Sequence, residues 1–294
     1  MHKEKVFLVA GGDLRQVYMA QILAENNKVY LIGFDKNTVP SDKVILIDSL
    51  MNLTERVDYI ILPLPASHDG VMVNTPFFKY SIPLDNLVSL LKEDGLIFGG
   101  KLSPMTSEVF ASRSLTAIDY FDREELIVWN AIPTAEGAIQ IAMEELPTTL
   151  CNLRVLITGF GRIAKALAKI LSGFGAKTSV TARKYSDLAW AEIYGCNAVH
   201  ISQVDTTLEE YDLVFNTVPA IVLGEKQLSG LKKSCLVIDL ASKPGGVDFD
   251  TASRLGVKTI WALSLPGKVA PVTSGEIIAH TILNILAERG EQNG

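Results

Sequence analysis

The chain has 294 residues, of which 48% are hydrophobic and 20% are charged, and its formal net charge is −6. This negative charge argues against a nucleic acid or an anionic membrane as the main partner, and no apolar run reaches the ~18 residues of a membrane span. Cys151, Cys196 and Cys235 lie far apart without a C-x-x-C pair, which excludes a disulfide framework and fits a reducing cytoplasm. The histidines are dispersed and predict no metal site.

Strands and helices alternate through the first part of the sequence. Residues 5–10 predict an apolar strand, Gly11-Gly12-Asp13 a turn, and residues 14–26 a helix with apolar positions at helical spacing. Further strands are expected at residues 29–34, 59–62 and 96–99, and a helix at residues 84–91. This alternation predicts a parallel sheet with helices on both faces, so residues 1–129 are expected to form an N-terminal α/β domain for the substrate or a partner.

Residues 130–149 are expected to connect this domain to a second one. Thr134 is a candidate N-cap for a helix over residues 138–145, and Pro147 breaks that helix before the next strand. A cleft between two such domains would bring a cofactor held by one domain to a substrate held by the other.

A dinucleotide-binding fingerprint of the form G-x-G-x-x-A follows a β-branched strand and precedes a helix over residues 163–174. Gly159 permits the tight turn, Gly161 lets a diphosphate approach the backbone, and Ala164 lets the helix pack closely on the strand. The free N–H groups at the helix N-terminus favour the phosphates. We expect the segment Gly159, Phe160, Gly161, Arg162, Ile163 and Ala164 to bind the cofactor.

The end of the next strand, at residues 177–182, predicts which dinucleotide binds. A protein that binds NAD usually places Asp or Glu there, against the ribose 2′-hydroxyl. Here Arg183 and Lys184 follow the strand, and two cations suit a 2′-phosphate. NADP is therefore predicted as the cofactor.

Three further strands are expected at residues 212–216, 235–240 and 259–263, and a final helix at residues 275–287. Ligands of open α/β sheets lie outside the carboxyl ends of the strands, where each of these strands leads into a loop. The predicted cofactor contacts in these loops are Thr217, Val218, Pro219, Leu240, Ala241, Pro266 and Gly267. The predicted fold is therefore two doubly wound, Rossmann-like α/β domains joined by a connecting helix, with NADP bound at residues 150–279 and a helix end and tail at residues 280–294.

Six short motifs are distributed over nearly the whole chain: residues 11–16 (GGDLRQ), 33–35 (GFD), 132–137 (IPTAEG), 159–162 (GFGR), 239–246 (DLASKPGG) and 265–271 (LPGKVAP). In this combination they resemble the A subunit of dipicolinate synthase, a protein family of spore-forming bacteria. The second domain is also similar to those of shikimate, 2-hydroxyacid and alanine dehydrogenases.

This resemblance implies an oxidoreductase subunit that forms dipicolinate, pyridine-2,6-dicarboxylate, in the cytoplasm of the sporulating mother cell. The implied substrate is dihydrodipicolinate or its 4-hydroxytetrahydro precursor. The implied partner is the B subunit of dipicolinate synthase, which resembles a flavoprotein. A homo-oligomer also stays open.

The implied chemistry suggests substrate and catalytic residues. A dicarboxylate calls for a forked donor, and Arg15 with Gln16 at the start of the first helix is the first candidate. A proton acceptor is also needed, for which Glu136 and, as an alternative, Asp13 are the candidates. Smaller hydrogen-bonding candidates for the substrate are Ser67, Asn130 and Thr134.

Two other hypotheses remain. One is a shikimate- or hydroxyacid-type NADP dehydrogenase, although no Lys/Asp or His/Glu catalytic pair is evident in the sequence. The other is a non-catalytic subunit that binds NADP(H) while a partner enzyme performs the chemistry.

Overall fold

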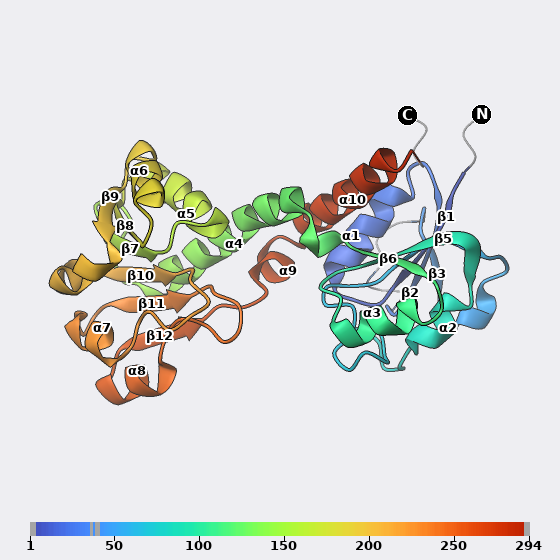
Figure 1. Cartoon of the computed structure of the whole chain (residues 1–294), viewed down its shortest axis with the longest axis horizontal. Coiled ribbons are helices and arrows are strands. Elements are labelled where there is room, and N and C mark those ends of the chain that lie inside the picture. Colours follow the sequence, from blue (N-terminus) through green and yellow to red (C-terminus); the bar gives the residue numbers. More distant parts are fainter. Residues whose placement is uncertain (1–3, 36–37, 39–41, 291–294) are drawn as a thin grey trace. The chain divides into compact units, whose positions relative to one another are not determined.

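The computed structural model describes residues 4–35, 38 and 42–290 and divides into two compact units. Unit 1 contains residues 1–129 and 270–294, and unit 2 contains residues 130–269. Each unit is built around one six-stranded parallel sheet (Figure 1). The predicted class, two doubly wound α/β domains, is confirmed.

The sheet of unit 1 has the strand order β3-β2-β1-β4-β5-β6. Helices α1 and α10 cover one face, and α2 and α3 cover the other. The buried apolar residues of the first two helices belong to one core, and those of the other two belong to a second core. The elements are β1 (Val6–Ala10), α1 (Leu14–Leu23), β2 (Lys28–Ile32), β3 (Ile45–Ile47), β4 (Val57–Ile61), α2 (Leu84–Val88), β5 (Leu91–Gly99), α3 (Pro104–Ala111), β6 (Thr116–Asp119) and α10 (Pro271–Glu288).

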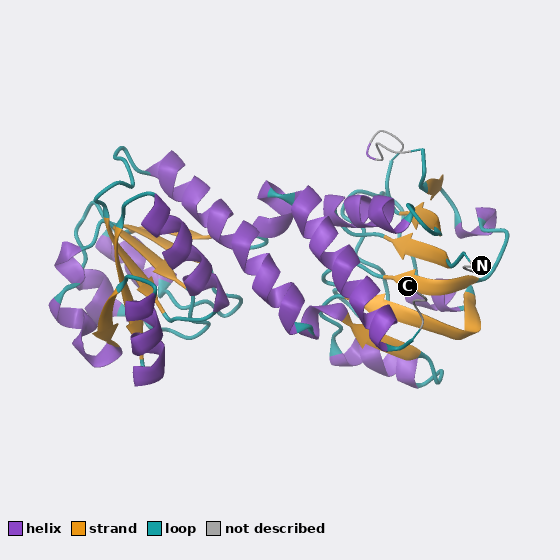
Figure 2. Ribbon diagram, turned by 90° about the horizontal axis from the view of Figure 1, so that it is seen from above, coloured by secondary structure: helices purple, strands orange, loops and turns teal. Residues whose placement is uncertain are grey.

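The sheet of unit 2 has the same arrangement, β12-β11-β10-β7-β8-β9. Two cores again lie on opposite faces, so that helices cover both sides of the strand layer (Figure 2). The elements are β7 (Arg154–Thr158), α5 (Arg162–Gly173), β8 (Lys177–Ala182), α6 (Tyr185–Ile193), β9 (Asn197–His200), β10 (Leu213–Asn216), α7 (Glu225–Gly230), β11 (Leu236–Asp239), α8 (Phe249–Leu255), β12 (Lys258–Trp261) and α9 (Leu265–Val269).

The predicted connector is part of one long helix, α4 (Glu124–Glu145), which contains Pro133. Thr134 is therefore not an N-cap: its hydroxyl donates to the carbonyl oxygen of Asn130, one turn earlier, at 2.7 Å. The helix continues past the proline because it buries an alanine-rich stripe in the core of unit 2. That stripe contains Ala131, Ala135, Ala138, Ile139 and Ala142.

Other boundaries also differ from the sequence-based expectation. The helix expected to reach residue 91 ends at Val88, because Leu91 already pairs with Val57 in the sheet. Strands β3, β6 and β9 were not predicted. Each lies at an edge of its sheet and buries at most one residue, so its apolar pattern is weak.

Residues 270–279 are grouped with unit 1, where α10 packs against α1. Gly275 makes this contact close, because a Cβ atom there would lie 2.6 Å from the carbonyl oxygen of Arg15.

Candidate functional site

The β7–α5 turn has the geometry of an open phosphate loop. Gly159 has a φ of +84°, which favours glycine, and its N–H donates to the carbonyl oxygen of Thr181 at 2.8 Å. Gly161 faces open space, since a Cβ atom there would have no neighbour within 4 Å. No side chain caps the N-terminus of α5, so its first N–H groups point at this space. Ala164 is fully buried and brings the helix close to the strand.

This turn lies at the topological switch point of the sheet. Strand β7 stands between β10 and β8, where the strand order reverses and where open α/β sheets bind their ligands. The hydrogen bond from Gly159 to Thr181 holds the end of β8 beside the turn. Arg183 and Lys184 follow directly after β8, and both side chains are exposed. The residues present thus fit a dinucleotide, with cations where the adenosine ribose would lie.

The remaining rim residues come from three segments of unit 2. Thr217, Val218 and Pro219 follow β10, and Leu240 and Ala241 follow β11, as expected from the sequence. The segment expected to be a loop at Pro266 and Gly267 instead forms the short helix α9. Pro266 is buried and Gly267 is half-buried there.

The corresponding turn of unit 1 is filled by its own chain. Gly12 donates its N–H to the carbonyl oxygen of Asn74 at 2.8 Å. A Cβ atom at Gly11 would lie 2.7 Å from the same oxygen and 2.8 Å from Val73. In addition, the carboxyl group of Asp13 caps the N-terminus of α1 by accepting from the N–H of Arg15. Gly159, which corresponds to Gly11, is crowded in the same way, so the two turns differ at the helix N-cap. Gly161 faces open space at the start of α5, whereas Asp13 places a carboxylate at the start of α1, where it would repel a diphosphate.

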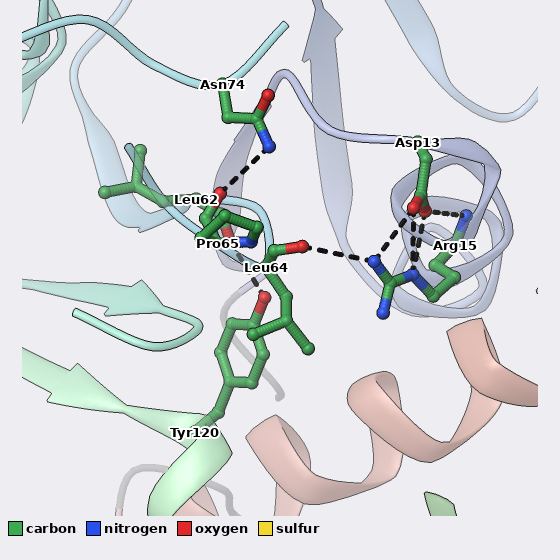
Figure 3. Close-up of polar contacts among 7 residues, drawn as sticks. All are labelled: Asp13, Arg15, Leu62, Leu64, Pro65, Asn74 and Tyr120. Atoms are coloured by element: carbon green, nitrogen blue, oxygen red, sulfur yellow. Dashed lines mark hydrogen bonds and ion pairs between the residues drawn. The ribbon is translucent and has the colours of Figure 1, made fainter. Parts of the chain in front are cut away.

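Arg15, the first substrate candidate, is held by neighbours in unit 1 (Figure 3). Its Nε and Nη2 each donate at 2.8 Å to a carboxyl oxygen of Asp13, and Nη2 also donates to the carbonyl oxygen of Leu64 at 3.1 Å. Nη1 has no hydrogen-bond partner among the residues that the structure describes. The guanidinium group of Arg15 therefore keeps Nη1 available as a donor, but Asp13 neutralises much of its charge.

Gln16 and Tyr120 lie beside this pair. Gln16 is fully buried, and within the described part of the chain its amide meets no hydrogen-bond partner at normal geometry. Burial raises the pKa of the Tyr120 hydroxyl, which therefore stays protonated and donates to the carbonyl oxygen of Leu62 at 3.1 Å (Figure 3). The Gln16 amide is thus a polar group with unused capacity at the carboxyl end of the unit 1 sheet.

The other predicted residues have mixed environments. The buried hydroxyl of Ser67 donates to the carbonyl oxygen of Met72 at 2.5 Å and accepts from the N–H of Gly70, so it closes a turn. The hydroxyl of Thr134 donates to the backbone carbonyl oxygen of Asn130 within α4. Glu136 is exposed on α4, and its carboxyl group has no hydrogen-bond or ion-pair partner among residues 4–35, 38 and 42–290. The predicted residues are divided between the units: Ser67, Arg15 and Gln16 belong to unit 1, and the three residues of α4 belong to unit 2.

Three buried polar residues were not predicted from the sequence. Thr158, Asn216 and Asp239 end the central strands β7, β10 and β11 and hydrogen-bond to one another. In the sequence each of them is a single polar residue at the end of an apolar strand. Many strands end in this way, so the sequence pattern did not distinguish these residues.

Two kinds of site are absent from the described residues. No group of three or more His, Cys, Asp or Glu side chains there is arranged to hold a metal ion. None of the helices in this part of the chain combines the length and apolar character needed to cross a bilayer.

Comparison with known proteins agrees with this geometry. Residues 6–121 match the family model of the N-terminal domain of the dipicolinate synthase A subunit. The chain is also 30% identical to the A subunit of dipicolinate synthase from Bacillus subtilis (strain 168), over 97% of both chains. The chain belongs to the dipicolinate synthase A-subunit family. The resemblance found in the sequence motifs is confirmed.

Solved structures of this family have the same fold. The A subunit from Bacillus halodurans aligns with a TM-score of 0.88 at 31% identity, covering 96% of this chain and 98% of that one. The Bacillus subtilis protein aligns with a TM-score of 0.88 at 30% identity, covering 99% of both. A transhydrogenase from Sinorhizobium meliloti shares only the fold, with a TM-score of 0.71 at 12% identity over 98% of this chain and 95% of that one.

The second unit has its own family match. Residues 133–244 match the NAD-binding domain of D-isomer specific 2-hydroxyacid dehydrogenases. Unit 2 of this dipicolinate synthase family member is therefore a dehydrogenase-type domain, as the fingerprint predicts.

Proposed function

We propose that this chain is the NADP-dependent oxidoreductase subunit of a dipicolinate synthase. The observation that carries the proposal is the open Gly159–Gly161 turn next to the exposed cations Arg183 and Lys184. Family membership and the dehydrogenase-type domain support the reaction class. The product is pyridine-2,6-dicarboxylate, formed from dihydrodipicolinate or, with loss of water, from its 4-hydroxytetrahydro precursor.

Unit 2 has separate groups of residues that are suited to bind the two halves of the cofactor. The uncapped N-terminus of α5 faces the diphosphate, while Arg183 and Lys184 bind the 2′-phosphate. The loops after β10 and β11 border the other half. Bound NADP⁺ supplies the hydride acceptor, and the protein has to orient the substrate ring and accept a proton.

Substrate binding and proton transfer are assigned to groups with unused capacity. Nη1 of Arg15 and the buried amide of Gln16 are proposed to bind the dicarboxylate in unit 1. Glu136 is proposed as the proton acceptor, because its carboxyl group is exposed, whereas the Asp13 carboxyl group is already bound to Arg15. Two smaller candidates, Ser67 and Thr134, already donate their hydroxyls to backbone carbonyls, which lowers their value as substrate ligands.

The partner and the location are proposed from the family alone. The flavoprotein-like B subunit would complete the enzyme in the cytoplasm of the sporulating mother cell. The Bacillus subtilis relative is named as one subunit of its synthase, and this name supports the existence of a second chain.

The deciding experiment follows NADP(H) absorbance and pyridine-dicarboxylate absorbance together. Dihydrodipicolinate synthase generates the substrate in situ, and the chain is assayed alone and then with the B subunit. We expect NADPH and dipicolinate to form in equal amounts, with NADP⁺ preferred to NAD⁺. Dipicolinate formation without reduction of either nicotinamide dinucleotide would contradict the proposal. Turnover only in the presence of the B subunit would move the search for the proton acceptor to the interface.

A further inference from the structure

Three central strands of unit 2 end in buried polar residues that face each other. Thr158, Asn216 and Asp239 are the last residues of β7, β10 and β11, and their exposed fractions are 2%, 0% and 0%. The sheet register pairs Asn216 with Thr158 on one side and with Asp239 on the other. Buried polar groups are costly unless they are hydrogen-bonded, so their bonds carry information about what they do.

The amide of Asn216 uses both of its ends. Its Oδ1 accepts from the hydroxyl of Thr158 at 2.5 Å and from the N–H of Val218 at 3.1 Å. Its Nδ2 donates to the carbonyl oxygen of Val218 at 3.0 Å and to Oδ1 of Asp239 at 2.7 Å. One side chain thereby fixes the backbone immediately after β10 to the ends of both neighbouring strands.

Asp239 fixes the next loop in the same way. Its Oδ1 also accepts from the N–H of Ala241 at 3.0 Å, and its Oδ2 accepts from the N–H of Gly246 at 2.8 Å. The loop lies directly against the pair, because a Cβ atom at Gly246 would be 2.2 Å from Nδ2 of Asn216. Residues 241–246 therefore fold back onto the strand ends. Fully satisfied polar networks of this kind rigidify what they hold.

We propose that Asn216 and Asp239 are positioning residues for the nicotinamide half of the cofactor. They act through the backbone of residues 217–219 and 240–246, which follow β10 and β11. These two strands lie on one side of β7, and β8 lies on the other. The inference rests on the proposed dinucleotide function. The cations Arg183 and Lys184 follow β8, on the other side of β7, so the adenosine half is outside the reach of the pair.

The test compares two ligands on the full chain by calorimetry: NADPH, which engages both halves, and adenosine 2′,5′-bisphosphate, which engages one. Asp239→Asn places an N–H₂ group among N–H donors and should weaken NADPH binding by about 10-fold or more. Binding of the bisphosphate should change by less than about 2-fold. Equal weakening of both ligands, or unchanged NADPH binding, would overturn the inference.

Thr158→Val is the second variant, and it tests the positioning role of Asn216 if Asp239→Asn does not fold. It keeps the side-chain shape and removes only the hydroxyl bonded to Asn216, so a smaller loss of about 3- to 10-fold for NADPH alone is expected. The matched control is Asp212→Asn, which directly precedes the opposite end of β10 and binds Lys232 at 2.6 Å. This control should leave both affinities within about 2-fold of wild type.

Failure of the proposed function has a separate signature. A wild-type chain that prefers NADH would contradict the assignment of NADP, and the same comparison with NADH and ADP would then test the positioning pair. A wild-type chain that binds neither dinucleotide would contradict the proposed function and this inference together.

Discussion

The guanidinium group of Arg15 is bound in a forked geometry by the carboxyl group of Asp13, two residues before it. Nε to Oδ1 and Nη2 to Oδ2 are both 2.8 Å, and the exposed fractions of the two side chains are 9% and 28%. The same carboxyl group caps α1. Arg15, which the sequence suggested as a donor to a substrate carboxylate, thus already forms an ion pair with Asp13 in the folded chain.

The Asp13–Arg15 pair should contribute measurably to the stability of unit 1. In a double-mutant cycle with Asp13→Ala and Arg15→Ala, we expect a coupling free energy of about 1 kcal/mol, because the pair is forked and mostly shielded from water. Arg113 and Asp85 form a matched control pair, 2.9 Å apart with exposed fractions of 43% and 60%. Their coupling should be less than about 0.5 kcal/mol. Urea denaturation measures both cycles, and equal coupling energies would refute this prediction.

Arg183 should set the preference between the two dinucleotides. Arg183→Asp should weaken NADPH binding by about 100-fold and NADH binding by less than about 3-fold, because only NADPH carries the 2′-phosphate. Lys177→Asp makes the same charge change at the start of the same strand and should affect neither ligand. Fluorescence titration of both reduced dinucleotides gives the ratio. An equal loss for both would place the 2′-phosphate site elsewhere.

Substitutions at Gly161 and Gly159 should affect different properties: cofactor affinity at Gly161 and thermal stability at Gly159. Gly161→Ala puts a methyl group into open space that the diphosphate needs, so NADPH affinity should fall by about 10-fold with Tm within about 2 °C of wild type. Gly159→Ala should lower Tm by several degrees, because its φ is +84° and the Cβ atom would lie 2.8 Å from Val218. The control Gly173→Ala lies in open space at the other end of α5 and should leave NADPH binding unchanged. A normal affinity in Gly161→Ala would exclude this turn as the diphosphate site.

Glu136 should be needed for turnover and not for cofactor binding. Glu136→Gln should lower kcat of the complex with the B subunit by about 100-fold, since general acid–base groups contribute roughly 10²–10⁴-fold. NADPH affinity should stay unchanged. Glu144→Gln is the control, an exposed glutamate two turns further along α4 that accepts from Gln140 at 2.9 Å. Loss of activity in both variants, or in neither, would remove Glu136 from the mechanism.

Local patterns were sufficient for the overall fold and for the conformation of the β7–α5 turn. Gly159, Gly161 and Ala164 are close in sequence, and each is explained by the conformation of one strand, one turn and one helix. The short edge strands and the extent of α4 were not predictable in the same way. Helix α4 passes through Pro133 because the alanine stripe on one side of it is buried, and that burial depends on elements far along the chain.

The sequence by itself determined the alternation of strands and helices, the fingerprint turn and the cations after β8, because these depend on backbone preferences and on neighbours within a few residues. Only the tertiary structure decided between the two glycine turns. The N-cap of α5, Gly161, faces open space, whereas the N-cap of α1, Asp13, folds its carboxyl group onto the N–H and the guanidinium group of Arg15. The tertiary structure also decided that Asn216 and Asp239 form a bonded pair, since sheet register brings together residues 23 positions apart. Contacts between distant segments follow from packing, which no local pattern encodes.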